Sequence, residues 1–384
     1  MAELRLTRIA INGYRCFREF SAELAPLTVI VGANGSGKSS LFEFITFLKA
    51  GAEGPLPPEI VPGTAGMQIF HDAESPALDW ELAFTHDNGS LIYRGQLLGP
   101  RGSVSIPSEE LRLEAPGVRQ PVLSVDGVRG TFSDKPLSTR EGTLNRPRAN
   151  QLVISSELAA ESAGTAGSLR MFLLSSDVFL SAPTARGLAR PVSIEQDAVL
   201  DPRFTNLAAV LLLIQTEFPA AFDSIQRDLS LLIPGLKRAT VKPRGGPGEA
   251  MAYLTIGRIE SSLGDLSDGQ LRMLCWVTLC NLPTPAPLIC IDEPDQGIHP
   301  RALAILAAMF RRASGRSQFV ITTHNSYFLK QFDYRNEIAV MRLEAGRSVF
   351  VRTRDSAALV ANLEEFGSDE IERMHHTQEL DALA

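Results

Sequence analysis

The sequence predicts an α/β protein built around a mainly parallel β-sheet that carries a phosphate-binding loop at one edge. A β-branched apolar run at 27–31 is followed by a glycine-rich loop and then by a helical pattern. Further along, apolar strand patterns at 288–291 and 318–322 alternate with helical patterns at 267–282 and 300–313. Strands that alternate with helices favour parallel pairing, and almost unbroken apolar strands are typical of a sheet covered on both faces.

The glycine-rich loop reads GANGSGKSS and fills the phosphate-loop template G-x-x-x-x-G-K-S. Glycine lets successive backbone N–H groups turn toward an anion, and the helix that begins near Lys38 adds the positive end of its dipole. We expect Lys38 to reach the β- and γ-phosphates of ATP and the Ser39 hydroxyl to ligate Mg²⁺. The alternative is a glycine turn that matches by chance, which the order of strand, loop and helix disfavours. The expected nucleotide contacts are Gly32, Ala33, Asn34, Gly35, Ser36, Gly37, Lys38, Ser39 and Ser40.

Two carboxylates follow the apolar strand at 288–291, within the stretch PLICIDEPDQGIHP. These residues, Asp292 and Glu293, stand at the carboxyl end of a strand, which is the edge of a parallel sheet that also holds the phosphate loop. Asp292 suits a Mg²⁺-linked carboxylate, and Glu293 suits the general base that activates a water beside the γ-phosphate. The alternative is an ordinary strand that ends in an acidic turn.

The stretch LSDGQ precedes a long apolar helical pattern. Its Ser267 and Gln270 have the S-x-x-Q spacing of a capping box, so the simplest interpretation is a well-capped helix. The N-terminus of a helix also binds anions, and Ser267 with Gly269 would place a hydroxyl and free N–H groups against a phosphate.

His324 lies just past the strand pattern at 318–322, in QFVITTHNS. A single histidine after a strand often has a structural role. If this strand neighbours the one that ends at Asp292, however, His324 lies near the γ-phosphate and can donate a hydrogen bond in the transition state.

Length and composition limit the class of protein. With 384 residues and 44% hydrophobic content, the chain is long for one domain, so we expect two lobes or a head with an insertion. A net charge of −7 argues against coating nucleic acid by global charge, so any DNA contact must be a local patch. Two basic clusters, Arg311/Arg312/Arg316 and Lys237/Arg238/Lys242/Arg244, are candidates, although such clusters are usually solvated faces.

Cysteine usage and hydropathy indicate a cytoplasmic protein with no membrane segment. No apolar run approaches membrane-spanning length, and the charged start of the chain lacks a signal-peptide pattern. Four cysteines have no metal-ligand spacing, and we expect them to be reduced thiols.

The remaining elements are predicted from periodicity and turn residues. A hairpin is expected around Asn12-Gly13, and the helix after the phosphate loop is expected to stop at Gly51. The region 99–149 looks rich in loops because Gly and Pro interrupt its patterns. Helices at 206–218 and 219–232, strands at 239–242 and 251–256, a hairpin of 337–343 with 348–352, and two C-terminal helical segments complete the prediction, without heptads for a coiled-coil arm.

Five segments together resemble the ATP-binding cassette (ABC) ATPases, specifically the RecF/SMC/OLD-like branch of soluble, DNA-associated heads. The segments are GYRCF at 13–17, GANGSGKSS, LSDGQ, IDEPDQGIHP and TTHNS. The resemblance covers residues 1–50 and 200–345. It implies a P-loop NTPase fold, a two-lobed ABC/RecF-type head with a mixed β-sheet and an irregular insertion.

The same resemblance implies a homodimer that encloses two ATP molecules. Each site would join the loop 32–39, Asp292, Glu293 and His324 of one protomer to Ser267 and Gly269 of the other. Arg15 of the GYRCF segment would lie over the nucleotide. Asp268 stands where transporter-type cassettes usually have glycine, which suggests slow turnover.

The resemblance also suggests how the chain is divided. We expect one ATPase head over 1–384, with a less regular insertion at about 97–195, a signature-helix lobe at 200–282, and the second half of the nucleotide-binding core at 283–384. The glutamine that couples the lobes has two candidates, Gln151 and Gln196, and neither is placed in the site. The 60 residues after His324 are too few for the nuclease domain of OLD-like proteins, so a nuclease would be a separate chain.

The expected function is a Mg²⁺-dependent ATPase that dimerises on ATP and acts on DNA, or on a nuclease or effector partner, in DNA repair or anti-phage defence. One alternative is the nucleotide-binding subunit of a membrane transporter. Another is a scaffold that binds ATP without turnover, although such a scaffold has no need of a base at Glu293.

Overall fold

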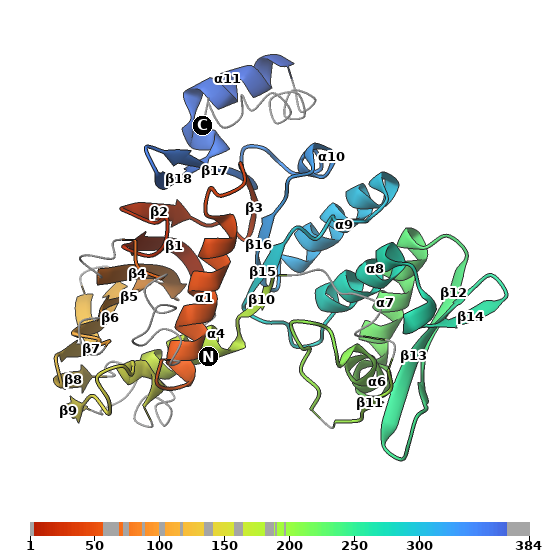
Figure 1. Cartoon of the computed structure of the whole chain (residues 1–384), viewed down its shortest axis with the longest axis horizontal. Helices are drawn as coiled ribbons and strands as arrows, with labels where there is room; N and C mark the ends of the chain where they lie inside the picture. The colour runs from red at the N-terminus through yellow and green to blue at the C-terminus, as the bar shows by residue number, and fades with distance from the viewer. Residues whose placement is uncertain are drawn as a thin grey trace.

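The structure is a computed structural model, and three β-sheets with helices between them make up its described part (Figure 1). No helix in that part is long and apolar enough to cross a membrane. The described residues are 4–56, 69–71, 77–86, 89–99, 104–115, 118–133, 141–156, 164–180, 188, 190–195 and 197–366.

The central sheet has the strand order β10-β15-β16-β3-β17-β18. All neighbours pair in parallel except β17 and β18, which form the predicted closing hairpin and make the sheet mixed. The sheet therefore confirms the predicted α/β class. Its strands are β3 (Leu27–Val31), β10 (Asp177–Phe179), β15 (Leu288–Asp292), β16 (Gln318–Thr322), β17 (Ile338–Glu344) and β18 (Arg347–Arg352).

Both faces of this sheet are covered, which is why its central strands are apolar at nearly every position. Val29 and Ile321 face a core that includes the helices α6 (Leu207–Glu217), α7 (Pro219–Leu232), α8 (Asp268–Cys280) and α9 (Pro300–Ala313). Ile30 and Val320 face the opposite core, which includes helix α1 (Lys38–Glu53). The predicted bounds of α6, α7, α8 and α9 agree with the observed bounds to within two residues.

Helix α1 lies between the central sheet and a second, antiparallel sheet with the order β2-β1-β4-β5-β6-β7-β8-β9 (Figure 1). Helix α4 (Thr165–Ser175) and the short turn η1 (Val153–Ser155) pack beside α1. The strands are β1 (Arg5–Asn12), β2 (Phe20–Glu23), β4 (Ala77–His86), β5 (Gly89–Leu98), β6 (Ser108–Ala115), β7 (Val118–Asp126), β8 (Arg129–Ser133) and β9 (Glu141–Asn145).

Three sequence-based expectations for the antiparallel sheet and helix α1 are wrong. The region 99–149 is not rich in loops, because β6 to β9 run through it. The hairpin of β1 and β2 exists, but Ile11 pairs with Phe20, so its connection is longer than a two-residue turn. Helix α1 does not stop at Gly51, where a Cβ would lie 2.6 Å from Leu152 Cδ1. Gly51 therefore serves close packing, and the helix ends at Glu53.

A third sheet covers α6 and α7 in the second lobe. Its order is β11-β13-β12, and β14 pairs with β13 on the same sheet. Its strands are β11 (Val192–Ser193), β12 (Leu236–Pro243), β13 (Glu249–Ile256) and β14 (Ile259–Ser262). The division of the chain at 97–195, 200–282 and 283–384 stays a prediction.

Short helical elements complete the described chain. They are η2 (Leu263–Asp265), α10 (Ser326–Leu329), η3 (Thr353–Asp355) and α11 (Ala357–Phe366). Helix α11 is the first of the two predicted C-terminal helical segments, and the second lies outside the described residues.

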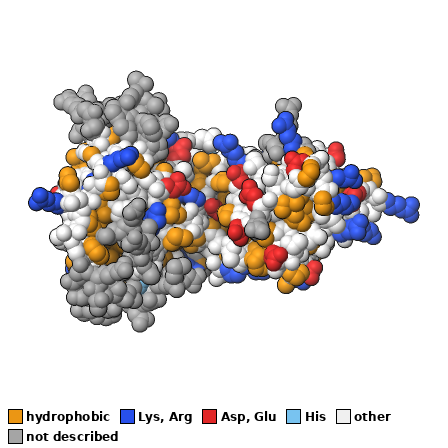
Figure 2. All heavy atoms as spheres, turned by 90° about the horizontal axis from the view of Figure 1, so that it is seen from below, with side chains coloured by type: hydrophobic (Ala, Val, Ile, Leu, Met, Phe, Trp, Pro, Cys, Tyr) orange, Lys and Arg blue, Asp and Glu red, His pale blue; other side chains and the backbone are white. Residues whose placement is uncertain are grey.

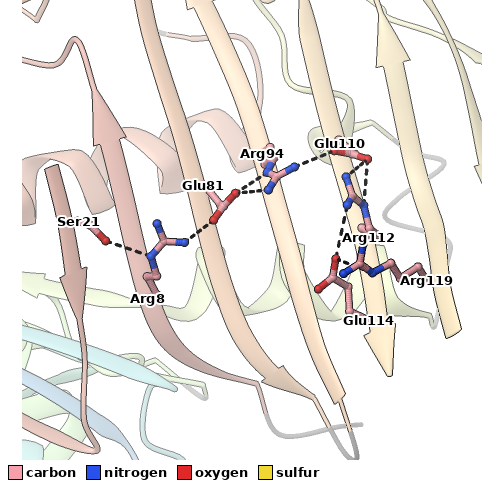
Figure 3. A network of polar contacts seen from close by, with 8 residues as sticks. All are labelled: Arg8, Ser21, Glu81, Arg94, Glu110, Arg112, Glu114 and Arg119. Carbon is pink, nitrogen blue, oxygen red and sulfur yellow. Dashed lines mark hydrogen bonds and ion pairs between the residues drawn. The ribbon is translucent and has the colours of Figure 1, made fainter. Parts of the chain in front are cut away.

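The outer face of the antiparallel sheet carries a ladder of alternating charges (Figure 3). Glu81 joins Arg8 and Arg94 across three strands, at 2.6 Å and 2.5 Å. Ion pairs at such exposed positions contribute little stability each, and salt screens them. The ladder also includes Ser21, Glu110, Arg112, Glu114 and Arg119.

A buried ion pair ties the antiparallel sheet to η1. The side chains of Glu109 and Arg146 are 0% and 2% exposed, and Arg146 Nη1 lies 3.3 Å from Glu109 Oε2. The Glu109 carboxylate also accepts hydrogen bonds from the backbone N–H groups of Val153 and Ile154 and from the Tyr93 hydroxyl. Burial raises the pKa of Glu109, and these donors oppose that rise.

We predict that Glu109→Ala destabilises the fold by about 3–5 kcal/mol, because it leaves the Arg146 charge buried without its partner. Urea unfolding followed by circular dichroism measures this loss. Glu114→Ala in the exposed ladder is the control and should cost less than about 1 kcal/mol. Equal midpoints for the two variants would contradict the structural role of Glu109.

Candidate nucleotide-binding site

The loop between β3 and α1 has the geometry of a phosphate-binding loop. Gly37 precedes α1 with φ of 105°, in the left-handed region that favours glycine. A Cβ on Gly32 would lie 1.8 Å from the Met341 carbonyl oxygen, so β17 requires glycine there. The Ser348 hydroxyl holds the loop from β18 by donating to the Ser36 carbonyl at 2.7 Å. The backbone is thus fixed in a tight turn at the start of a helix.

Two side chains in this loop fit a phosphate ligand. Lys38 is 6% exposed, and its ammonium donates to the carbonyl oxygens of Gly32 and Ala33 at 2.7 Å and 2.9 Å. The buried Ser36 hydroxyl has no hydrogen-bond partner among the described residues. Because a buried polar group without a partner is costly, an anion in the loop would satisfy this hydroxyl.

The edge of the sheet beside the loop offers ligands for Mg²⁺. Ser39 Oγ donates to Asp292 Oδ2 at 3.1 Å, and the Thr322 hydroxyl donates to the other carboxylate oxygen. The parallel register aligns Asp292 with Thr322 and Thr322 with Ile30, so three strand ends meet here. The described residues contain no cluster of three or more His, Cys, Asp or Glu that could hold a metal. One carboxylate and one hydroxyl suit a Mg²⁺ ion that takes its other oxygen ligands from phosphates and water.

Glu293 and His324 lie together at the same edge, 3.5 Å apart between Oε1 and Nε2. As predicted, the strand before His324 neighbours the strand of Asp292. The Glu293 backbone has φ of 50°, which is unusual for a residue with a side chain. Such conformations cost about 1–3 kcal/mol and cluster at functional sites. The Thr322 carbonyl supports this turn by accepting the Glu293 N–H at 3.2 Å.

Ser267 and Gly269 lie at the start of α8, apart from the phosphate loop. Ser267 caps α8 through the predicted capping box with Gln270, and it is exposed. A Cβ on Gly269 would lie 2.8 Å from the Gly297 carbonyl oxygen, so the start of α8 packs against the turn after β15. Figure 1 shows α8 on the opposite side of β15 from α1. One chain thus brings Lys38 and Ser39 to the sheet edge but leaves the start of α8 apart from them.

Arg15 lies next to a residue that borders the phosphate loop. The neighbouring Cys16 Sγ would lie 2.8 Å from a Cβ on Gly37. The Arg15 guanidinium instead pairs with Glu43 on α1 and lies over the Tyr14 ring, at 5.7 Å from its centroid. The expected contact between Arg15 and the nucleotide stays a prediction.

Of the two candidate coupling glutamines, Gln151 does not join the site. Gln151 bridges to Pro55, just beyond the C-terminal end of α1. Since α1 has 16 residues, this end is roughly 24 Å from the phosphate loop. Gln196 lies outside the described residues. Asp268 is exposed in the first turn of α8.

Four residues of the site escaped the sequence analysis. Thr322 binds Asp292, and the Thr323 hydroxyl donates to the buried Asp295 at 2.8 Å. Burial raises the pKa of Asp295. The Gln296 amide donates to the Glu293 carboxylate. Two threonines at the end of an apolar strand were a usable signal, whereas the role of Gln296 depends on the folded turn.

The first basic cluster is structural. Arg311 pairs with Glu337 at 2.6 Å, and Arg312 pairs with Asp228 on α7. Arg316 donates to the carbonyl oxygens of Cys280 and Leu282 at the end of α8, at 3.0 Å and 3.1 Å. These arginines thus hold α9 and the segment after it to neighbouring elements.

Comparisons with known proteins agree with this geometry. The family model described as "AAA domain, putative AbiEii toxin, Type IV TA system" matches residues 216–330, and the model described as "AAA domain" matches residues 8–146. No curated protein matches the chain.

Solved structures of SMC heads have the same fold. An Smc head bound to the C-terminal winged-helix domain of ScpA is 15% identical with a TM-score of 0.58, covering 90% of this chain and 97% of that one. The Pyrococcus furiosus Smc head with an extended coiled coil, bound to the C-terminal domain of ScpA, is 12% identical with a TM-score of 0.58, covering 94% and 100%. The Pyrococcus yayanosii Smc head with a coiled coil and joint is 12% identical with a TM-score of 0.52, covering 94% and 99%.

The chain therefore has the fold of SMC heads, and its residues 8–146 and 216–330 match models of AAA domains. The sequence-based fold class, including its phosphate loop and mixed sheet, is therefore confirmed. The roles of individual site residues stay predictions.

We predict that Lys38→Ala weakens ATP binding by about 10- to 100-fold, because a charged contact to the phosphates is lost. Titration with a fluorescent ATP analogue measures the affinity. Lys49→Ala is the control on the same helix, since Lys49 donates to the Ser176 carbonyl at the other end of α1. If Lys38→Ala binds the ATP analogue as tightly as the wild type does, the loop is not part of the nucleotide-binding site.

Proposed function

We propose that this protein is a Mg²⁺-dependent ATPase that dimerises on ATP and works as a switch. The single observation that carries this proposal is the separation of the site into two parts. Lys38 and Ser39 at the start of α1 lie at the sheet edge with Asp292, whereas the capped start of α8, with its exposed Ser267, lies on the opposite side of β15 from α1. A second copy of the chain can supply the missing part to the nucleotide.

In the proposed reaction, the loop N–H groups and Lys38 bind the phosphates of ATP. Ser39 and Asp292 would hold Mg²⁺, which would supply positive charge against the charge that develops on the phosphates. Glu293 accepts the proton of the attacking water, while His324 donates a hydrogen bond toward the γ-phosphate. Hydrolysis then yields ADP and phosphate.

The proposed dimer is symmetric, so each phosphate loop faces the start of the other copy's α8. A helix N-terminus and the Ser267 hydroxyl are suited to bind a γ-phosphate. The Asp268 carboxylate nearby opposes a phosphate, which supports slow turnover. Because each nucleotide touches both copies, ATP closes the dimer and hydrolysis opens it.

Several observations support DNA as the molecule that the proposed switch binds. Residues 236–265 hold five basic and three acidic residues, although the whole chain has a net charge of −7. On the third sheet, Arg238 and Lys242 alternate along β12 with the buried Ala239 and Val241, so these two cations share one face, where Lys242 pairs with Glu260 at 2.6 Å. Figure 2 shows Lys and Arg side chains gathered at this end of the molecule.

The comparisons support a protein partner as well. One matching model is described as a putative toxin of a type IV toxin–antitoxin system, and the Smc heads are bound to ScpA domains. We therefore propose that a nuclease or effector chain binds the dimer and responds to whether the dimer is closed on ATP or open after hydrolysis, in DNA repair or anti-phage defence.

We predict that wild-type protein releases phosphate slowly and that Glu293→Gln lowers this rate by at least about 100-fold, because the general base is lost. The variant should accumulate as an ATP-bound dimer, which size-exclusion chromatography with light scattering detects. If both proteins stay monomeric and equally inactive with ATP and Mg²⁺, the switch proposal fails.

We predict that charge reversal at Arg238, Lys242 and Arg244 weakens DNA binding and lowers the slope of log K against log salt by roughly 2–3. Fluorescence anisotropy with duplex DNA at several salt concentrations measures this slope. Arg119→Glu, on the other sheet with a side chain 80% exposed, is the control. Equal slopes in all proteins would exclude this face as the DNA contact.

A further inference from the structure

The start of α8 packs directly on the turn that follows β15, which contains Glu293. The Arg272 guanidinium donates a hydrogen bond from Nη1 to the Gln296 carbonyl oxygen. One turn further along α8, Trp276 Nε1 donates to the Pro294 carbonyl at 3.0 Å. Two backbone carbonyls of the turn are thus held by side chains of α8.

Gly297 makes this contact possible. Its φ is +70°, and a Cβ at this position would lie 2.2 Å from Arg272 Nη1. Arg272 Nε is buried and has no hydrogen-bond partner among the described residues. The guanidinium therefore lies against the turn in one fixed place, at the cost of one unsatisfied donor.

Inside the turn, Gln296 connects the backbone that Arg272 holds to the carboxylate of Glu293. The Gln296 backbone carbonyl accepts from Arg272, and its side-chain amide donates to Glu293 Oε2. The other carboxylate oxygen, Oε1, faces His324 Nε2 at 3.5 Å. One oxygen is held by the turn, and the other points toward the proposed reaction site.

We propose that Arg272 and Gln296 are positioning residues that make the orientation of the Glu293 carboxylate depend on the position of α8. This inference rests on the proposed function, in which Glu293 is the base and the start of α8 meets the nucleotide of a second copy. A shift of Ser267 and Gly269 on that nucleotide moves Arg272, and the turn follows. Hydrolysis is then fastest when the start of α8 in each copy contacts the nucleotide bound to the other copy.

The geometry explains why such a connection matters for rate more than for binding. A general base acts only within hydrogen-bond reach of its water, and a displacement of about 1 Å costs up to 100-fold. ATP affinity comes from the loop and Lys38, on the other side of β16. Loss of Gln296 should therefore change kcat and leave the KM for ATP almost unchanged.

The experiment uses the full chain and the nearly isosteric variant Gln296→Leu, which keeps the volume but loses the amide donor. We expect kcat to fall about tenfold or more, with KM for ATP within about twofold of wild type. The ATP-bound dimer should form and live longer, since its hydrolysis is slower. Gln331→Leu is the matched control, because Gln331 is half-buried and its amide donates to the Tyr327 carbonyl in α10, away from Glu293.

Two further variants separate positioning from a general structural role. In a Glu293→Gln background, Gln296→Leu should not change the lifetime of the ATP-bound dimer, because both residues act through one carboxylate. Arg272→Lys keeps a donor and should retain more kcat than Arg272→Met, with KM unchanged in both.

Specific results would overturn the inference. Wild-type kcat in Gln296→Leu, or a dimer lifetime that changes equally in both backgrounds, excludes the connection while leaving the ATPase proposal intact. Absence of ATPase in wild type, or full activity in Glu293→Gln, overturns the proposed function and this inference together.

Discussion

The hydrogen bond from the Ser39 hydroxyl to the Asp292 carboxylate joins the start of α1, which follows β3, to the end of β15, a strand that does not neighbour β3. Strand β16 lies between β3 and β15, and its last residue, Thr322, binds the other oxygen of the same carboxylate. This meeting is possible only because all three strands run in parallel and end at one edge. Parallel strands in turn need helices on both faces, so the cores around α1 and around α6 to α9 both serve this edge.

Near this edge, several groups lack a hydrogen-bond partner, have a strained backbone or bond only to their own loop. The Ser36 hydroxyl is buried without a partner, Glu293 has a left-handed backbone, and Lys38 turns back on its own loop. Such costs are sustained where the surrounding packing determines the backbone, and a bound anion would offset part of them. In the proposed dimer, the start of α8 with its exposed Ser267 would be the matching anion site on the other copy. Each copy would then supply two complementary parts of the two sites.

The central sheet was readable from the sequence because its elements combine unbroken apolar strands with distinct helical periods. Helix α9 and strand β16 have the bounds predicted for them. The antiparallel strands β6 to β9 were missed because Glu109 points inward where an apolar residue is expected and Pro121 interrupts the alternation. Among the site residues, Ser39 and Asp292 belong to local motifs and could be predicted. Gln296 could not, since its contact with Glu293 exists only in the folded turn.

The claim that two copies complete each site is tested most directly by complementation. Two proteins are prepared, one with Lys38→Ala and the other with Ser267→Arg, and ATPase is measured for each alone and for a mixture. Each alone should be inactive, and the mixture should recover about a quarter of wild-type activity, because half of the dimers are mixed and each has one intact site. A mixture as inactive as its components, or full activity of Ser267→Arg alone, would contradict a site shared between two copies.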